Sequence, residues 1–368
     1  MKQEIKRTFE DQRILLDGAC WLECTFVNCE IVINTGEMEV KGCHFNKCRL
    51  ILDGNAKNIF SMIELFSNVN KKNIALLVGN GFTLDFVEQH GLNSSYPLKN
   101  FNNMDINYSE FINYLPSIKK ELMGQDIPDF DSISDFLTKY KISSVKECEL
   151  RRFLAMAYSK FQLSVDQHDM HEWKWVKWLK QNREQIACGI SFNYDLLLER
   201  AITHAGISYS RVGTNEQLGN IPILKPHGSI DFDVTNGIVI EPIETIWNVT
   251  TTLNNLDMVE VIKGSEWLKP RVEADIIPPS VANYNRQLRW IDSMYNLYES
   301  ISGSLRSLIM IGCSYWDVDR PEIDFFLEKL PKSAKIYIMN PKPSEPLIEK
   351  IESLGLSWDK FNFDELPW

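Results

Sequence analysis

The chain lacks any apolar run long enough to cross a membrane, although 44% of its 368 residues are hydrophobic. A membrane-spanning helix needs about 20 consecutive apolar residues, so we expect no membrane-spanning segment. The N-terminal residues also lack the basic and then apolar pattern of a secretory signal peptide. The sequence therefore predicts a cytoplasmic protein.

Basic residues are in short supply. The chain has 39 lysines and arginines against 50 aspartates and glutamates, which gives a net charge of -11. A surface of that sign repels the phosphate backbone of nucleic acids. We therefore expect no direct binding of nucleic acid.

No two cysteines have the CxxC spacing, so a zinc ribbon of two such pairs cannot be built. The eight cysteines are expected to stay reduced in the cytoplasm, which excludes a disulfide framework. From these spacings we predict that the protein holds no metal.

Residues 1–55 carry a repeat with a period of five. Five of the eight cysteines lie between Cys20 and Cys48, and a large apolar residue follows two positions after four of them, at Phe26, Ile31, Phe45 and Leu50. This period fits neither an α-helix nor a strand, but it suits a β-solenoid of square cross-section, and it resembles a short pentapeptide-repeat coil. The alternative is a zinc site that uses His44, the one nearby histidine.

A solenoid of about two turns cannot cover its own apolar ends, so we expect it to pack against another subunit or domain. We also expect the protein to form a homo-oligomer. After it, residues 56–72 have apolar positions at helical spacing and predict a connecting helix.

From residue 73 to 368, short apolar runs alternate with segments of helical period. A series of buried runs separated by helices indicates an α/β domain with a doubly wound, mostly parallel, Rossmann-like sheet. Such a sheet binds ligands beyond the carboxyl ends of its strands. The runs lie at residues 74–79, 188–192, 223–228, 276–279, 308–312 and 336–340.

Between residues 84 and 185 no comparable apolar run appears, and the spacing is helical, which predicts a helical insertion. This segment contains Trp173, Trp175 and Trp178. Because Trp175 and Trp178 share a helix face, we expect them to pack in a core and not to stack on a nucleotide.

Two loops after predicted strands supply the first candidate ligand contacts. The first loop runs from Gly79 through Asn80, Gly81 and Phe82 to Thr83 and enters a helix, where a glycine-rich backbone and free N–H groups suit a pyrophosphate. The second contains Asn193 and Asp195. An amide at Asn193 can bind ribose hydroxyls, and the alternative is that the pair caps a helix.

Three later loops add further candidates. His227 and Gly228 follow the third run, where a histidine at the carboxyl end of a strand suits acid–base chemistry although a structural histidine is the alternative. Gly312 and Ser314 follow the fifth run, and Asn340 follows the sixth. Small or amide side chains at these positions could admit a ribose or an adenine.

Taken in this order, the loops resemble the sirtuin family over residues 73 to about 345. In that family a glycine-rich first loop, an Asn-x-Asp, a His-Gly, a Gly-x-Ser and a late asparagine line one pocket for NAD. The resemblance implies that NAD contacts Gly79, Asn80, Gly81, Phe82, Thr83, Asp195, Gly228, Gly312, Ser314 and Asn340. It also implies that Asn193 and His227 are catalytic.

The missing zinc ribbon departs from the sirtuin deacylases and disfavours deacylation. What remains is similar to the zinc-free bacterial branch that destroys NAD in anti-phage defence. The resemblance therefore implies an NAD glycohydrolase in which Asn193 orients ribose and water. His227, with an ordinary pKa near 6.5, would accept a proton. The alternative is a module that senses NAD or ADP-ribose without turnover.

The resemblance also suggests partners. Members of this branch often work beside a translocase-type ATPase or an Argonaute-like protein, so a defence partner of either kind is expected. No residue of the chain indicates which partner it is, or what activates the protein.

Overall fold

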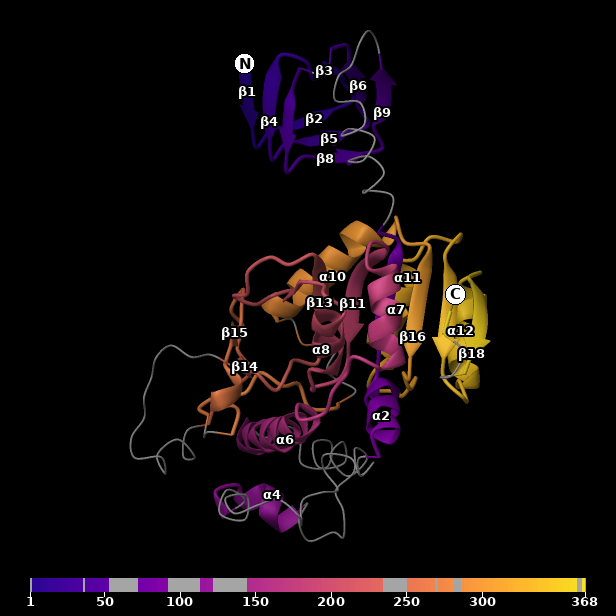
Figure 1. The fold of residues 1–368 in the computed structure, drawn as a ribbon. Helices are drawn as coiled ribbons and strands as arrows, with labels where there is room; N and C mark the ends of the chain where they lie inside the picture. The colour runs from indigo at the N-terminus through magenta and orange to yellow at the C-terminus, as the bar shows by residue number, and fades with distance from the viewer. Residues whose placement is uncertain are drawn as a thin grey trace. The chain divides into compact units, whose positions relative to one another are not determined.

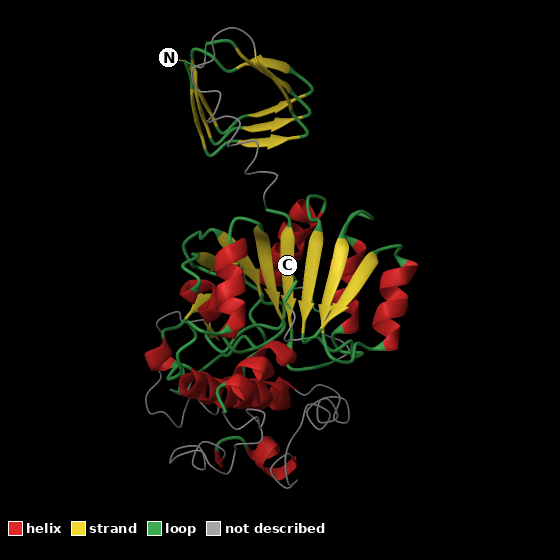
Figure 2. Cartoon of the chain, turned by 45° about the vertical axis from the view of Figure 1, so that its right-hand side comes forward, coloured by secondary structure: helices red, strands yellow, loops and turns green. Residues whose placement is uncertain are grey.

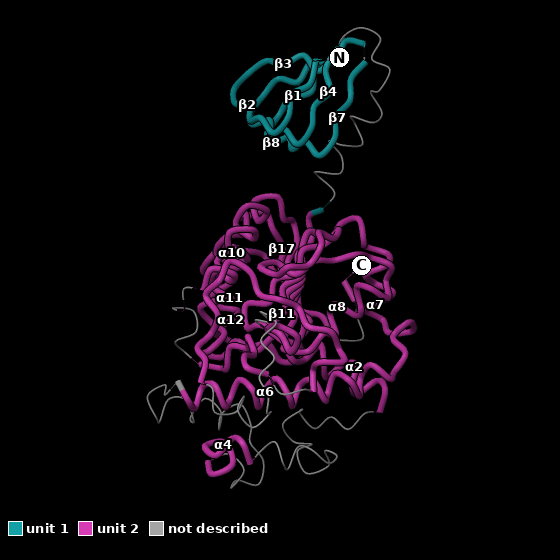
Figure 3. The backbone as a smooth tube through the Cα atoms, turned by 90° about the vertical axis from the view of Figure 1, so that its left-hand side faces the viewer, with its two compact units in different colours: residues 1–72 teal, residues 73–368 magenta. Residues whose placement is uncertain are grey.

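The computed structural model describes residues 2–35, 37–52, 72–91, 113–121, 144–233, 250–268, 271–280, 286, 288–362 and 366–367. The predicted connecting helix at 56–72 lies outside the described residues, Lys72 excepted. The chain divides into two compact units, Met1–Lys72 and Asn73–Trp368 (Figure 3).

The N-terminal unit is built from nine short strands. They pair in parallel into three sheets of three strands, in the orders β1-β4-β7, β2-β5-β8 and β3-β6-β9 (Figure 1). The chain thus visits the three sheets in turn and adds one strand to each, whereas the predicted square cross-section requires four faces. The strands are β1 (Lys2–Ile5), β2 (Thr8–Glu10), β3 (Arg13–Leu15), β4 (Ala19–Leu22), β5 (Thr25–Val27), β6 (Glu30–Ile33), β7 (Glu39–Lys41), β8 (His44–Asn46) and β9 (Arg49–Leu52).

Equivalent side chains of successive strands stack inside this unit. The ring centroids of Phe9 and Phe26 lie 5.3 Å apart, and those of Phe26 and Phe45 lie 4.8 Å apart. The buried cysteines stack in the same way, since the backbone N–H of Cys24 lies 3.3 Å from Sγ of Cys43. The five-residue period also appears at the corners, where non-glycine residues take a left-handed backbone, at Lys6, Asp11, Glu23, Asn28 and Lys47.

The second unit contains a parallel sheet of seven strands in the order β12-β13-β11-β10-β16-β17-β18. All six neighbouring pairs run parallel. The predicted α/β class with a mostly parallel sheet is therefore confirmed. The strands are β10 (Ile74–Val78), β11 (Ile186–Ser191), β12 (Tyr209–Arg211), β13 (Ile221–Leu224), β16 (Ser307–Ile311), β17 (Lys335–Met339) and β18 (Ser357–Phe361).

Helices cover both faces of this sheet (Figures 1 and 2). Successive side chains of a strand point to opposite faces, and β10 shows the result: Ala75 and Leu77 pack with one set of helices, while Leu76 and Val78 pack with the other. One face carries α2 (Asn80–Gln89), α7 (Lys174–Asn182) and α8 (Leu197–His204), and the other carries α10 (Arg289–Ser302), α11 (Arg320–Glu328) and α12 (Glu345–Ser353).

The described residues between β10 and β11 contain helices and no strand. Besides α2 and α7, they form α4 (Pro116–Glu121) and α6 (Ser144–Val165), and α6 lies beyond the carboxyl ends of the strands (Figure 2). Trp173, Trp175 and Trp178 are fully buried and pack with Phe82 and with Leu76 of β10. Trp175 and Trp178 are thus core residues as predicted, but the core they join is that of the sheet and not one within the insertion.

Two details of the strand assignment were wrong. The run at 276–279 is not a strand of the sheet, because its residues make only an isolated bridge from Ile276 to Gly228. The sheet instead gains two edge strands, β12 and β18, that lack a continuous apolar run. A short antiparallel pair, β14 (Phe232–Asp233) and β15 (Glu260–Val261), lies outside the sheet.

The longest described helix, α6, has 22 residues. It carries charged side chains along its length, among them Arg151 and Arg152. Of the helices that the structure describes, none is both long enough and apolar enough to span a membrane.

Candidate functional site

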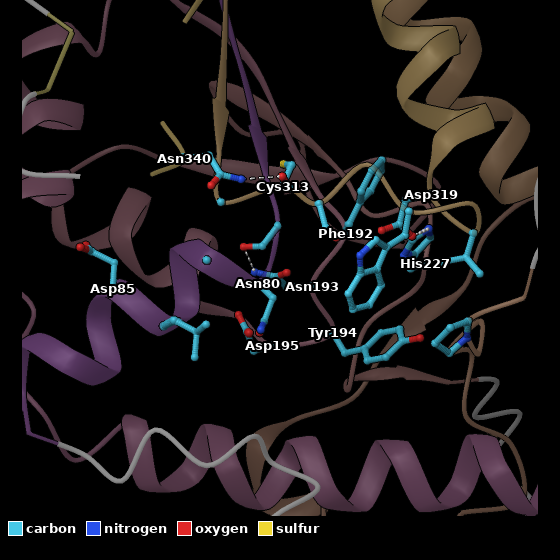
Figure 4. A pocket seen from close by; sticks show the side chains of 18 of the residues that line it. Asn80, Asp85, Phe192, Asn193, Tyr194, Asp195, His227, Cys313, Asp319 and Asn340 are labelled. Carbon is cyan, nitrogen blue, oxygen red and sulfur yellow. Dashed lines mark hydrogen bonds and ion pairs between the residues drawn. The ribbon is translucent and has the colours of Figure 1, made fainter. Parts of the chain in front are cut away.

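The strand order of the large sheet reverses beside its first strand. The chain leaves β10 in one direction, through β11 and β13, and later returns to the other side of β10 with β16 and β17. In open α/β sheets, ligands bind in the crevice that forms at such a reversal, beyond the carboxyl ends of the strands. A cavity of about 680 Å³ lies there, lined by residues of all five following loops, including Gly79, Asn193, His227, Gly312 and Asn340 (Figure 4).

The loops after β10 and β16 pack backbone against backbone. The N–H of Gly79 donates to the carbonyl of Ile311 at 2.9 Å, and the N–H of Gly81 donates to the carbonyl of Gly312 at 3.0 Å. A Cβ on Gly81 would lie 2.5 Å from Cα of Gly312. The glycines are therefore required for the contact between the two loops. This requirement is a second reason for glycine here, besides the predicted close approach of a ligand to the backbone.

The helix that follows the first loop presents its N-terminus to the cavity. Helix α2 begins at Asn80, and its capping residue, Gly79, has no side chain to bond the first N–H groups of the helix. Two of these groups are bonded by the backbone instead, since the N–H of Gly81 donates to Gly312 and that of Phe82 donates to Gly79. The first turn also contains no acidic residue. This end of α2 thus keeps the partial positive charge of a helix N-terminus, which suits a phosphate.

Asn193, in the second loop, bonds to the first loop. Its Nδ2 donates to the carbonyl of Gly79 at 2.9 Å and to Oγ1 of Thr83 at 3.1 Å. Both N–H groups of the amide are thus used within the protein. The group that Asn193 can offer to a ligand is its Oδ1, which would accept a hydrogen bond from a ribose hydroxyl.

Asp195 lines the cavity but is bonded on both carboxylate oxygens. Oδ2 accepts from Oγ1 of Thr83 at 2.7 Å, and Oδ1 accepts from the N–H of Leu197, the first residue of α8, at 3.1 Å. Burial raises the pKa of Asp195, and the charge of Lys225 opposes that rise. These contacts match the capping alternative, and they fix the loop that carries Asn193.

A buried lysine joins the second loop to the third. Lys225 is fully buried, and its Nζ donates to the backbone carbonyl of Asp195 at 2.6 Å and lies 3.1 Å from Oε1 of Glu199. Lys225 stands two residues before His227. It thereby holds the loops of Asn193 and His227 in a fixed relation.

His227 is buried at the cavity wall with its ring stacked on Phe192, with centroids 4.7 Å apart. Its Nε2 lies 2.5 Å from Oε2 of Glu322 and 3.9 Å from Oδ1 of Asp319. Burial lowers the pKa of His227, but the charge and hydrogen bond of Glu322, the charge of Asp319 and a backbone hydrogen bond at Phe192 together raise it to about 9.

The pKa of His227 therefore lies above the ordinary value near 6.5 that was expected. The role of His227 as a base stays a prediction. At neutral pH the ring is protonated, and both of its nitrogens face acceptors of the protein. In this arrangement His227 is a buried cation beside the carboxylates of Asp319 and Glu322.

Two carboxylates beside His227 were not predicted from the sequence. Asp319 precedes α11 and lines the cavity, while Glu322, in the first turn of α11, accepts a hydrogen bond from the hydroxyl of Tyr295 at 3.2 Å. Burial raises the pKa of Asp319 to about 6; the charge of His227 opposes that rise and the charge of Glu322 adds to it. The sequence signal was the acidic stretch that follows Gly312 and Ser314.

The remaining predicted contacts divide into two groups. Ser314 and Asn340 line the cavity, and Nδ2 of Asn340 donates to the carbonyl of Cys313 at 3.1 Å. Three predicted residues are not among those that line it, for reasons of packing. Phe82 is buried against Trp173, Thr83 is buried beneath Asn193, and Gly228 has a φ of +75° with its Cα against the carbonyl of Asp275.

The described residues that line the cavity include no lysine or arginine. The acidic side chains among them are Asp85, Glu88, Asp195 and Asp319. Asp85 is neutralised by Lys174, whose Nζ lies 2.6 Å from Oδ1. Favourable charge for the phosphates of a ligand would therefore come from the N-terminus of α2, and a cationic group of the ligand would be favoured near Asp319.

One group of possible metal ligands occurs among the described residues, formed by Asp169, His171 and His204. None of the three lines the cavity. The expectation that the protein holds no metal stays a prediction.

No protein-family model matches the chain, and no curated protein matches its sequence.

Proposed function

We propose that the chain is an NAD glycohydrolase that breaks the bond between nicotinamide and ribose and releases nicotinamide and ADP-ribose. The observation that carries the proposal is the meeting of five loops in one cavity at the strand-order reversal, with Asn193 and His227 on its wall. A cavity of about 680 Å³ has the size of a typical ligand site.

The parts of NAD match the parts of the cavity. The partial positive charge at the N-terminus of α2, whose first turn has no acidic residue, suits the pyrophosphate. Oδ1 of Asn193 suits a ribose hydroxyl, and the loop at Asn340 leaves room for the adenosine end. The cluster of His227, Asp319 and Glu322 carries a net charge of about -1 when all three are ionised, which suits the cationic nicotinamide and the oxocarbenium-like ribose of the transition state.

A sensor that binds NAD or ADP-ribose without turnover is the second candidate. One observation favours it: both nitrogens of His227 are engaged by Glu322 and by the backbone at Phe192. The two candidates differ in product. A sensor releases no nicotinamide, although NAD still raises its melting temperature because the ligand binds only the native state.

The biological setting that we propose is anti-phage defence in the cytoplasm, with activation by oligomerisation or by a partner ATPase or Argonaute-like protein. The proposal rests on the resemblance of the ordered loops. It is tested by whether depletion of cellular NAD on phage infection requires this chain.

Replacement of Asn193 tests the ribose contact. We expect Asn193→Ala to weaken NAD binding about fivefold, since one hydrogen bond contributes about 1 kcal/mol. Turnover should fall further because the ribose is no longer oriented. Calorimetry and nicotinamide release measure the two effects. The control Asn296→Ala, at an exposed position of α10, should change neither NAD binding nor nicotinamide release. If Asn193→Ala binds and cleaves NAD as the wild type does, Asn193 does not have this role.

The N-terminal unit is proposed to be a short β-solenoid that drives assembly. Among the described residues, each of its three sheets ends in a strand edge with no further strand paired to it, and such edges pair readily with another chain. Deleting residues 1–55 should therefore lower the number of subunits measured by light scattering, while NAD binding stays unchanged. An equal subunit number for the truncated and full-length proteins would rule out this role.

A further inference from the structure

Hydrolysis of NAD needs a group that accepts a proton from the attacking water. His227 is protonated and held by Glu322, so it does not supply that group in this structure. Glu322 is bonded to His227 and Tyr295 and is not among the residues that line the cavity. Asp195 has both oxygens bonded to Thr83 and Leu197. Of the carboxylates named in this cluster, Asp319 is the one that faces the cavity beside His227.

We propose that Asp319 is the catalytic carboxylate of the cavity. This role rests on the proposed NAD glycohydrolase function. It stabilises the positive charge that develops on the ribose and accepts a proton from water. The bond between C1′ and the nicotinamide nitrogen breaks, and its electron pair neutralises the pyridinium. The water oxygen bonds to C1′, its proton passes to the Asp319 carboxylate, and that proton then leaves to solvent.

The backbone holds Asp319 in place at the start of α11. Its N–H donates to the carbonyl of Trp316 at 3.0 Å, and its own carbonyl accepts from the N–H of Ile323 at 3.0 Å. Arg320, the next residue, lies over the ring of Tyr315. Its ion pair with Asp317 is largely exposed and contributes little to holding the turn. The carboxylate is thus presented to the cavity by a fixed turn (Figure 4).

Exposure separates Asp319 from its neighbour in the same turn. The side chain of Asp319 is 19% exposed, whereas that of Asp317 is 74% exposed. A carboxylate in a partly desolvated cavity interacts more strongly with a nearby charge than one in water does. Asp319 can therefore stabilise a cationic transition state, and Asp317 serves as the matched control.

The groups around Asp319 determine which side chains of the cavity are protonated at neutral pH. Four groups from different elements face it: His227 after β13, Glu322 on α11, Cys313 after β16 and Tyr194 after β11. Burial raises the pKa of the Cys313 thiol and of the Tyr194 hydroxyl, so both are neutral near pH 7. With a pKa of about 6, Asp319 is ionised at neutral pH and well matched to accept a proton, while His227 stays protonated.

The experiment compares Asp319→Asn with Asp317→Asn in the full-length chain, by nicotinamide release and by NAD binding in calorimetry. General base catalysis contributes about 10²- to 10⁴-fold. Asp319→Asn should lower the rate at least about 10²-fold and leave NAD binding within a few fold. Asp317→Asn should match the wild type in both.

The pH profile is a second readout that needs no variant. Because Asp319 must be ionised to accept a proton, the wild-type rate should rise with pH through about 6, and Asp319→Asn should lose this rise. If the wild type cleaves NAD but Asp319→Asn is as fast, or the wild-type profile is flat from about pH 5 to 7.5, the role of Asp319 is overturned and the glycohydrolase stands. If the wild type releases no nicotinamide, both proposals fall together.

Discussion

His227→Ala should lower the rate of NAD cleavage at least about 10²-fold, the size of a lost acid–base contribution. The substitution removes the cation between Asp319 and Glu322. Without that attraction the pKa of Asp319 rises further, so less of the proposed base is ionised at neutral pH. NAD binding should weaken much less, because the substitution leaves the proposed pyrophosphate site at the N-terminus of α2 unchanged.

Two further variants separate chemistry from folding. Removal of one partner of a buried pair can cost about 3–5 kcal/mol, so His227→Ala must be shown to fold by circular dichroism. His227→Gln retains a donor for Glu322 and should be equally slow while folding better. His171→Ala removes an exposed histidine that does not line the cavity and should be as active as the wild type. Wild-type cleavage by folded His227→Gln would show that His227 is not needed.

Gly312→Ala should reduce the free energy of unfolding by about 2–5 kcal/mol. Gly312 has a φ of +60°, and an added Cβ would overlap Cα of Gly81. A left-handed backbone costs about 1–2 kcal/mol for a residue with a side chain, and a forced shift of packed atoms costs about 1–3 kcal/mol more. NAD binding should fall as well, because the two loops line the same cavity.

Gly303→Ala is the matched control for the glycine contact. Gly303 ends α10 at an ordinary φ of -62°, and nothing lies within 4 Å of an added Cβ. Urea unfolding followed by tryptophan fluorescence compares the two proteins, since Trp173 and Trp290 are buried in the second unit. Equal midpoints for the two variants would mean that the loops after β10 and β16 do not need their close contact.

Much of the sheet could be predicted because its central strands are buried on both faces. A strand such as β10, with every residue buried, is a continuous apolar run in the sequence. The edge strand β18 (SWDKF) has no fully buried residue and contains three polar residues, so it has no such run. The segment at 276–279 has the opposite property: its apolar residues are buried by a loop contact with Gly228 and not by a sheet.

The cavity could be predicted as a place, but not as a set of charges. The rule that ligands bind beyond the strand ends brought together Gly79, Asn193, His227 and Gly312 from separate segments. The pairing of His227 with Glu322 depends on how α11 is placed against β13, which no local pattern encodes. The pKa of His227 follows from that pairing, so the sequence alone predicted a base where the structure has a protonated ring.

The most direct test of the central claim is analysis of the products after the full-length protein is incubated with NAD. The account predicts nicotinamide and ADP-ribose in equal amounts, at a rate that depends on Asn193, His227 and Asp319. The contradicting result is intact NAD after prolonged incubation under all activating conditions, together with a melting temperature that NAD raises, which would identify a sensor without turnover.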